Sequence, residues 1–181
     1  MKRTICLLIF LPLWSFAQQK TDHSKWAFGI EEDILPYATG GYFAAVWIGK
    51  DHLRSRILLA RVNKPDFIIK KGFTNNKVTA YAVTVDYFLA KDWTGWWASS
   101  GLVYWKSSIQ SDAKLSTAYY NNTLFNGSIG YNWKISKKIY LSPWAGLHLR
   151  IAGEQQVKVD NKIFNPPLLN PEASLKLGLQ F

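Results

Sequence analysis

The chain ends in Ala173-Ser-Leu-Lys-Leu-Gly-Leu-Gln-Phe181, and this stretch decides the fold class. Every second residue from Ala173 to Phe181 is apolar, and the residues between them include no large apolar side chain. A repeat of two places the apolar side chains on one face of a β-strand, whereas a helix would scatter them around its circumference. The sequence therefore predicts a terminal strand whose apolar face is formed by Ala173, Leu175, Leu177, Leu179 and Phe181.

The same alternation continues over a longer stretch, from Ile139 to Ile151, where an apolar residue again occupies every second position. A strand of this length exceeds most strands of soluble proteins, but it suits a tilted strand that crosses a bilayer and extends past it. Pro143 lacks the backbone N–H that a sheet requires. We therefore expect a β-bulge there, or a position near the start of the strand.

Six further segments have strand-like patterns, which brings the predicted number of strands to eight. They are 26–33, 42–50, 54–62, 78–89, 96–109 and 123–135. The pattern defines the two faces of 26–33, 78–89 and 123–135, as it does for the last two strands of the chain. It leaves open which face of 42–50, 54–62 and 96–109 points inward.

The connections between these segments alternate in length. Residues 51–53, 91–94 and 136–138 form short connections, whereas 35–41, 63–77, 110–122 and 154–170 form longer ones. This alternation is typical of bacterial outer-membrane barrels, in which periplasmic turns are short and extracellular loops are long. The sequence therefore predicts an all-β fold: an eight-stranded antiparallel up-and-down transmembrane β-barrel, with short periplasmic turns and longer extracellular loops.

The first 17 residues have the order of a secretory signal peptide. Lys2 and Arg3 are followed by the apolar run 5–14 and by small and polar residues around Ala17. The run is about half the roughly 20 residues that a spanning helix needs. We expect cleavage after Ala17, which divides the chain into a signal peptide (1–17), a short N-terminal tail (18–25) and the barrel (26–181). Cys6 is the only cysteine, so the mature chain would form no disulfide.

The composition fits export and a membrane environment. Hydrophobic residues make up 48% of the chain, and it contains nine Trp, a residue that concentrates where apolar and wet surfaces meet. The formal net charge is +10. A basic surface can face nucleic acid, anionic lipid or acidic glycans. Since export argues against nucleic acid, phosphate-rich lipopolysaccharide is the expected anionic partner, although ordinary solubility charge on the loops accounts for the excess equally well.

The alternating strands, the rhythm of turns and loops and the end of the chain together resemble the small eight-stranded outer-membrane protein families. These include the transmembrane domain of outer-membrane protein A and the outer membrane protein β-barrel domain. The resemblance implies a monomer in the outer membrane of a Gram-negative bacterium. It also implies that the barrel-insertion machinery reads the terminal strand as an assembly signal, formed by Leu175, Leu177, Leu179 and Phe181.

Residues for catalysis or for metal binding are sparse. His23, His52 and His148 fall in the tail, in a predicted turn and in the barrel interior, so they cannot converge on a metal ion. Some outer-membrane barrels modify lipid A with a serine, a histidine and an acid. Here Arg150 stands two residues after His148, where the deacylase pattern has serine. We therefore expect no catalysis, no metal and no cofactor.

Several charged side chains fall on predicted inward positions. An eight-stranded lumen is just filled by side chains, and charges inside it must pair or stay wet. They would form either a plug of salt bridges or a narrow gated passage. Glu31 and Lys176 lie on strands that adjoin when the barrel closes, which makes them candidate partners. The inward set is Glu31, Asp86, Lys134, His148, Arg150 and Lys176, and Arg54, Arg56 and Lys106 are further candidates.

Two predicted loops carry apolar residues that water does not favour. One contains Phe67, Ile68 and Ile69 followed by Lys70 and Lys71, and the other spans 164–169. Exposed apolar clusters often mark contact sites. Extra strand length above the membrane, or loops that pack against each other, would account for these residues equally well.

The sequence as a whole predicts an integral outer-membrane barrel with a structural or surface-interaction role, exerted through its basic extracellular loops. A narrow passage for small solutes and a lipid A-modifying enzyme are alternatives. A soluble periplasmic barrel that binds a lipid is a third alternative, and it requires the apolar faces of the strands to point inward.

Overall fold

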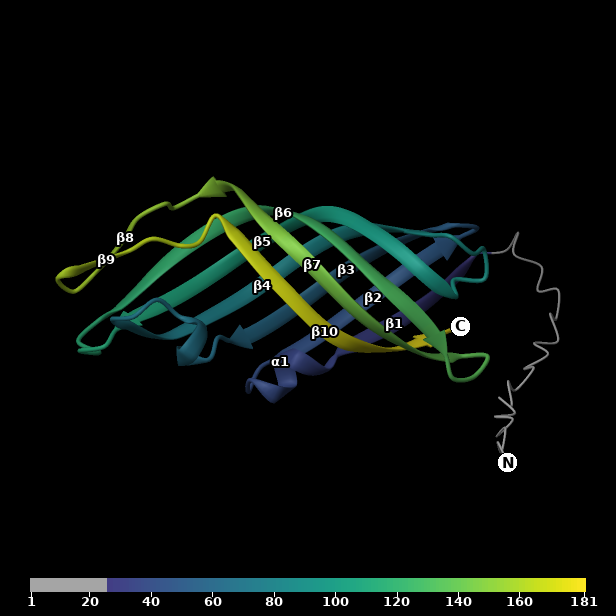
Figure 1. Ribbon diagram of the computed structural model, residues 1–181, viewed down its shortest axis with the longest axis horizontal. Coiled ribbons are helices and arrows are strands. Elements are labelled where there is room, and N and C mark those ends of the chain that lie inside the picture. Colours follow the sequence, from purple (N-terminus) through teal and green to yellow (C-terminus); the bar gives the residue numbers. More distant parts are fainter. Residues whose placement is uncertain (1–25) are drawn as a thin grey trace, which may run out of the picture.

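The computed structural model describes residues 26–181, in which eight antiparallel strands form a ring (Figure 1). The predicted signal peptide and tail lie outside the described residues. Each strand pairs with its neighbours, and β1 pairs with both β2 and β10, which closes the ring. The predicted fold class is confirmed. The strands are β1 (Ala27–Asp33), β2 (Tyr42–Lys50), β3 (Leu53–Asn63), β4 (Phe73–Phe88), β5 (Gly95–Ser111), β6 (Thr117–Lys134), β7 (Ile139–Gly153) and β10 (Leu169–Gln180).

The two ends of the ring differ. One end, which we call the turn end, holds the connections 51–52, 89–94 and 135–138 together with the C-terminus. The opposite loop end holds α1 (Ile34–Ala38), a 3-10 helix (Asp66–Ile68) and a hairpin of β8 (Val157–Val159) and β9 (Lys162–Phe164). Figure 1 shows this hairpin and the C-terminus at opposite ends of the molecule. Among residues 26–181, no helix is long and apolar enough to cross a lipid bilayer.

The strands of the loop end are longer than the sequence pattern indicates. Residues 110–122 are mostly strand, and β4 begins at Phe73, inside the predicted connection 63–77, since β4, β5 and β6 contain 16, 17 and 18 residues. The inner face of this extension has a hydrophobic core of its own, in which Phe73, Ile109 and Tyr120 pack against Val157 and Phe164 of the hairpin. These contacts join residues that are distant in sequence, so local alternation does not reveal them.

Outward positions along the strands are mostly apolar, and many inward positions are polar. Leu177 is 44% exposed on the outer face, whereas the neighbouring Lys176 is 4% exposed inside. The strands whose facing was open follow the same rule, with Val46, Ile57 and Leu102 pointing outward. This arrangement is the opposite of what a soluble lipid-binding barrel requires.

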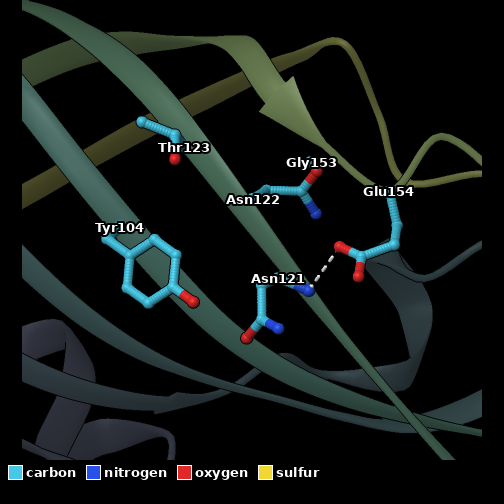
Figure 2. Close-up of a pocket in the computed structure, with 6 residues that line it drawn as sticks. All are labelled: Tyr104, Asn121, Asn122, Thr123, Gly153 and Glu154. Atoms are coloured by element: carbon cyan, nitrogen blue, oxygen red, sulfur yellow. Dashed lines mark hydrogen bonds between the residues drawn. The ribbon is translucent and has the colours of Figure 1, made fainter.

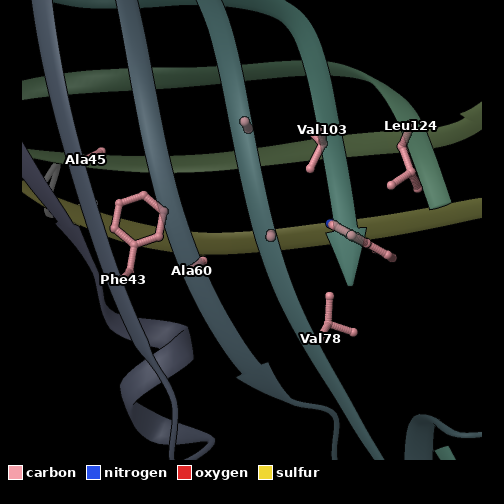
Figure 3. Close-up of a cluster of buried hydrophobic side chains, with 9 residues drawn as sticks. Phe43, Ala45, Ala60, Val78, Val103 and Leu124 are labelled. Carbon is pink, nitrogen blue, oxygen red and sulfur yellow. The ribbon is translucent and has the colours of Figure 1, made fainter. Parts of the chain in front are cut away.

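The interior is layered along the strands. Inward residues of β4 pass from Phe88 through Asp86 to Ala82, Ala80 and Val78. The first belongs to an aromatic cluster near the turn end, the second to a charged layer, and the last three to an apolar cluster with Phe43 and Leu124 (Figure 3). Side chains therefore fill the lumen over most of its length. The aromatic cluster consists of Trp47, Phe88, Trp93, Trp97 and Tyr140.

Pro143 is the fifth residue of β7, near the start of the strand, which was one of the two expected solutions. It faces Leu175 of β10, and the pairing of β7 with β6 is interrupted beside it without a change of register. The register shift of this strand lies near its other end, where Ile151 is skipped. The proline is therefore accommodated by a local gap in one ladder.

Replacing Leu177 by Arg should destabilise the folded barrel, because the sequence predicts that the outer face contacts lipid hydrocarbon. The expected cost is about 2–4 kcal/mol near the bilayer midplane and less toward the interfaces. Chemical unfolding in lipid vesicles measures the change, with Leu177→Ala as a control for lost apolar area. A reversed result, in which Leu177→Arg is tolerated while Lys176→Gln unfolds the protein, would contradict the observed facing.

Candidate functional site

Four charged side chains form a closed ring of ion pairs inside the barrel. The Arg54 guanidinium lies 2.9 Å from a Glu31 carboxylate oxygen and 2.8 Å from an Asp86 oxygen. The Arg56 guanidinium lies 2.6 Å and 2.7 Å from the other oxygens of the same two carboxylates. All four side chains are at most 2% exposed. Each charge therefore contacts two opposite charges, and the set, which we call the ion quartet, is neutral.

Aromatic side chains enclose the quartet on the side of the turn end. The Tyr140 hydroxyl donates to Glu31 at 2.7 Å and accepts from Arg54 at 3.0 Å. The Arg54 guanidinium also lies 4.9 Å from the ring centroid of Phe88 and 5.3 Å from that of Trp47. Burying four charges is costly, and these hydrogen bonds and cation–π contacts offset part of that cost.

Lys176 is inside the barrel but is not the ion-pair partner of Glu31. The arginines occupy both oxygens of that carboxylate. The Lys176 ammonium instead lies 4.4 Å from the ring centroid of Trp144 and 5.1 Å from that of Trp97. The Trp144 indole N–H donates to Asp33 at 2.8 Å, which orients the ring beneath the ammonium.

The other predicted inward residues lie apart from the quartet. His148 is buried near the loop end, with its Nε2 atom 3.1 Å from Glu172. Arg150 is half-buried and donates to the backbone carbonyl of Pro166 at 2.9 Å. Lys134 is half-buried at the last residue of β6, close to a turn. Of the six residues that the sequence placed inside the barrel, the structure brings together only Glu31 and Asp86. They are joined by two arginines that the sequence had offered as further candidates, Arg54 and Arg56.

Lys106 points outward, so the suggestion that it joins the interior was wrong. Its ammonium lies 5.8 Å from the ring centroid of Tyr81 on the outer wall. Both faces of β5 carry serine and aromatic residues, and for this reason the pattern could not distinguish them. The spacing of Arg54 and Arg56 by two residues on one strand was the available signal for the quartet, because a strand presents such residues on one face.

The residues proposed as a loop contact site separate into two groups. Ile69 packs against the hydrophobic core of the loop end, beside Phe73 and Phe164. The remaining four are exposed: Phe67, Ile68, Lys70 and Lys71.

Polar contacts hold the loops of the loop end together. The hydroxyls of Ser111 and Ser116 each donate to Asp160 at 2.5 Å, and these bonds hold the pKa of that carboxyl below its ordinary value. The Lys162 ammonium lies 2.5 Å from Asp112 and lowers the pKa of that carboxyl in the same way. Both carboxylates therefore stay charged at neutral pH and fix the hairpin to the β5–β6 connection.

A shallow pocket of about 370 Å³ lies where β5, β6 and the end of β7 meet (Figure 2). The Asn121 backbone N–H donates to Glu154 at 2.8 Å across it. Its lining contains no histidine, lysine, serine or cysteine. Within residues 26–181, no three His, Cys, Asp or Glu side chains come close enough to hold a metal ion. The pocket is lined by Tyr104, Asn121, Asn122, Thr123, Gly153 and Glu154.

Removing one member of the quartet should be strongly destabilising. Glu31→Gln leaves buried arginine charge uncompensated, and the expected cost is about 3–5 kcal/mol. The double variant Glu31→Gln/Arg56→Gln should lose less stability than the sum of the two single changes, since the pair is removed together. Unfolding in vesicles gives all three values, and Lys137→Gln in an exposed turn is the control. A single change as mild as that control would refute the structural importance of the quartet.

Comparisons with known proteins agree with this architecture. No protein-family model and no curated protein matches the chain. Among solved structures, the N-terminal β-barrel domain of Pseudomonas aeruginosa OprF is similar, with a TM-score of 0.59 and 12% identity over 86% of this chain and 97% of that chain. Neisserial surface protein A (NspA) matches with a TM-score of 0.48 and 11% identity, over 86% and 93%. The likeness to the OprF domain shows that the chain shares the fold of that β-barrel.

Proposed function

We propose that the protein is an integral outer-membrane β-barrel with a structural or surface-interaction role and no catalysis. The observation that carries the proposal is the apolar outer wall around a closed ring whose interior is charged yet sealed. A bilayer requires spanning strands to have no free edge, because unpaired backbone groups in hydrocarbon cost several kcal/mol each. The closure of β1 on β10 meets this requirement.

Aromatic side chains border the apolar wall at both ends, as in membrane girdles. Trp26, Trp96 and Trp133 are exposed toward the turn end. Tyr42, Tyr81 and Tyr104 are exposed toward the loop end. Beyond Tyr81, the outward residues of β4 become polar, beginning with Thr79. This order of surfaces along the barrel, with an apolar wall between two aromatic borders and polar residues beyond, fits an outer membrane in which the turn end faces the periplasm.

A structural role agrees with the interior better than a solute passage does. The quartet spans β1, β3 and β4 with side chains at most 2% exposed, and the aromatic cluster lies next to it on the side of the turn end. Both layers fill the lumen where a solute would have to pass.

A lipid A-modifying enzyme is also disfavoured. The Nε2 atom of His148 lies 3.1 Å from Glu172 and its Nδ1 atom 3.4 Å from the Asn126 side-chain nitrogen, so both ring nitrogens are engaged without a serine hydroxyl. Arg150 holds backbone carbonyls where that enzyme pattern has serine.

The proposal includes two partners. Exposed Lys70 and Lys71 near the loop end suit lipopolysaccharide, the phosphate-rich component of the outer leaflet. During assembly, the barrel-insertion machinery would bind the terminal strand. Phe181 stacks on Phe28 with ring centroids 5.6 Å apart, and its N–H donates to the Phe28 carbonyl at 2.8 Å. The last residue therefore contributes to the closing seam.

The protein should fractionate with outer membranes after expression in a Gram-negative host. Unboiled samples should also migrate differently from boiled samples on a denaturing gel, because a closed hydrogen-bonded barrel resists detergent. A soluble periplasmic lipid-binding protein from the same host provides the control for fractionation. Recovery of the protein in the soluble periplasmic fraction without detergent would overturn the proposed location.

Deleting Phe181 should lower the yield of folded barrel, since it removes both the predicted assembly signal and the contact with Phe28. The matched control is deletion of Asn161, which lies in the tip between β8 and β9. The heat-shifted band of membrane fractions quantifies the folded protein. Equal yields for the two deletions would remove the support for an assembly role.

A further inference from the structure

Three cationic side chains stand on the outer wall where the apolar surface ends, and we call them the basic row. Arg61 of β3, Lys77 of β4 and Lys106 of β5 are all exposed. Arg61 and Lys106 both pair with Thr79, from opposite sides, and Lys77 lies two residues further along β4. Two interstrand spacings place Arg61 and Lys106 roughly 10 Å apart at the backbone. The three charges therefore surround one patch of the wall.

An apolar groove of about 390 Å³ opens next to the basic row, on the side toward the membrane centre. Ala44, Leu59 and Tyr81 lie opposite one another on β2, β3 and β4, two residues below the level of Arg61 and Thr79. The small Ala44 side chain leaves the depression between its larger neighbours. The outward residues of this Ala44 groove are Ala44, Val46, Ile57, Leu59, Tyr81 and Val83.

The positive charge of this wall is not neutralised by the protein. In the part of the chain that the structure describes, none of the three cations has a carboxylate oxygen within 4.0 Å. Glu32 is the outward-facing carboxylate on the strands, and it accepts a hydrogen bond from the Tyr37 hydroxyl at 2.6 Å. It pairs with Leu177 of β10, and the neighbouring Glu31 pairs with Ala45 of β2, below the level of the basic row.

The opposite wall lacks this combination. The outward positions of β7 from Ile139 to Ile151, and those of β10 from Leu169 to Leu179, carry no charged residue. A cation cluster above an apolar groove is thus confined to the face of β2 to β5. General solubility of the loop end does not explain why the charges gather on one side.

We propose that this face binds a phosphorylated, multiply acylated glycolipid of the outer leaflet, the lipid A class. Phosphate groups contact the basic row, and one acyl chain occupies the Ala44 groove. The Lys106 ammonium, held 5.8 Å from the Tyr81 ring, joins the two parts of the site. The assignment rests on the proposed membrane location, and it adds an anion-binding surface on the barrel wall to the loop lysines proposed above.

Other occupants fit the geometry less well. A second copy related by a two-fold axis along the membrane normal would bring its own basic row to the same height, and like charges would face each other. Free inorganic phosphate could bind the cations but would leave the apolar groove empty. An uncharged lipid could use the groove but leaves the three cations without counter-ions. Only a ligand with phosphates and acyl chains uses both surfaces.

The test measures lipid binding to the detergent-purified barrel by native mass spectrometry. The probes are diphosphorylated lipid A, dephosphorylated lipid A, phosphatidylglycerol and inorganic phosphate. We expect lipid A to bind preferentially. Arg61→Gln and Lys106→Gln should each weaken binding about fivefold, since a cation near an anionic lipid surface contributes about that factor. Lys91→Gln and Lys137→Gln, in turns at the far end, provide the matched control and should change nothing.

Two further variants separate charge from shape. Arg61→Lys/Lys106→Arg keeps both charges and should retain binding, whereas Ala44→Trp fills the groove and should weaken lipid A binding with the basic row intact. The site would be overturned if the turn variants lost as much lipid A binding as the variants of the basic row. It would also be overturned if dephosphorylated lipid A or phosphatidylglycerol bound as well as lipid A, or if Ala44→Trp left lipid A binding unchanged. Competition by inorganic phosphate alone at comparable concentration would overturn it as well.

Failure of this inference is distinguishable from failure of the proposed function. All variants alter exposed side chains of the wall or of the turns, so each should keep the heat-shifted migration and the outer-membrane fractionation of the parent protein. If those properties persist without selective lipid A binding, the glycolipid site is wrong and the membrane location stands. If the parent protein itself is soluble, both are wrong.

Discussion

The hydrogen bonds between β1 and β10 are the constraint on which the rest of the structure depends. They run from the pair Gly29–Gln180 to the pair Asp33–Lys176 and join the two strands that would otherwise leave open edges. In hydrocarbon an open edge has no water to satisfy its N–H and C=O groups. Once the ring is closed, every strand has one inner and one outer face. The alternation of side chains then assigns each residue to the lumen or to the surroundings.

Closure with eight strands leaves a narrow lumen, and its contents follow from that size. Large rings fit only beside residues without a side chain: a Cβ on Gly130 would lie 2.3 Å from the Trp97 ring, and one on Gly178 would lie 2.0 Å from the Tyr140 ring. The charged layer follows the same logic, because two arginines and two carboxylates pair with one another where all four side chains are at most 2% exposed. The ion quartet is therefore a packing element as well as an electrostatic one.

The sequence predicted the number of strands, their order and the facing of five of them, because period-two alternation is a local property. It did not separate the faces of β5, where Ser99 and Ser100 follow Trp97 and Ala98 without a polar contrast. It also gave no sign that residues 110–122 are mostly strand, since the core that supports them depends on Val157 and Phe164. Within the lumen, the sequence placed Glu31, Asp86 and Lys176 inside, but it also offered Lys106, which points outward, and it omitted Asp33, which is buried. Three-dimensional proximity decided that Glu31 contacts arginines and not Lys176.

The division of charge between the two faces explains how a basic chain can line its lumen with ions. The quartet cancels internally, so it contributes nothing to the formal net charge of +10. The excess positive charge must lie elsewhere, and much of it stands on exposed turns, on loops and on the wall of β3 to β5. Charge inside the ring stabilises one packing arrangement, whereas unpaired charge outside it is available to a ligand. Arg56 and Arg61 lie five residues apart on one strand, which places them on opposite faces and gives chemically identical side chains these two different roles.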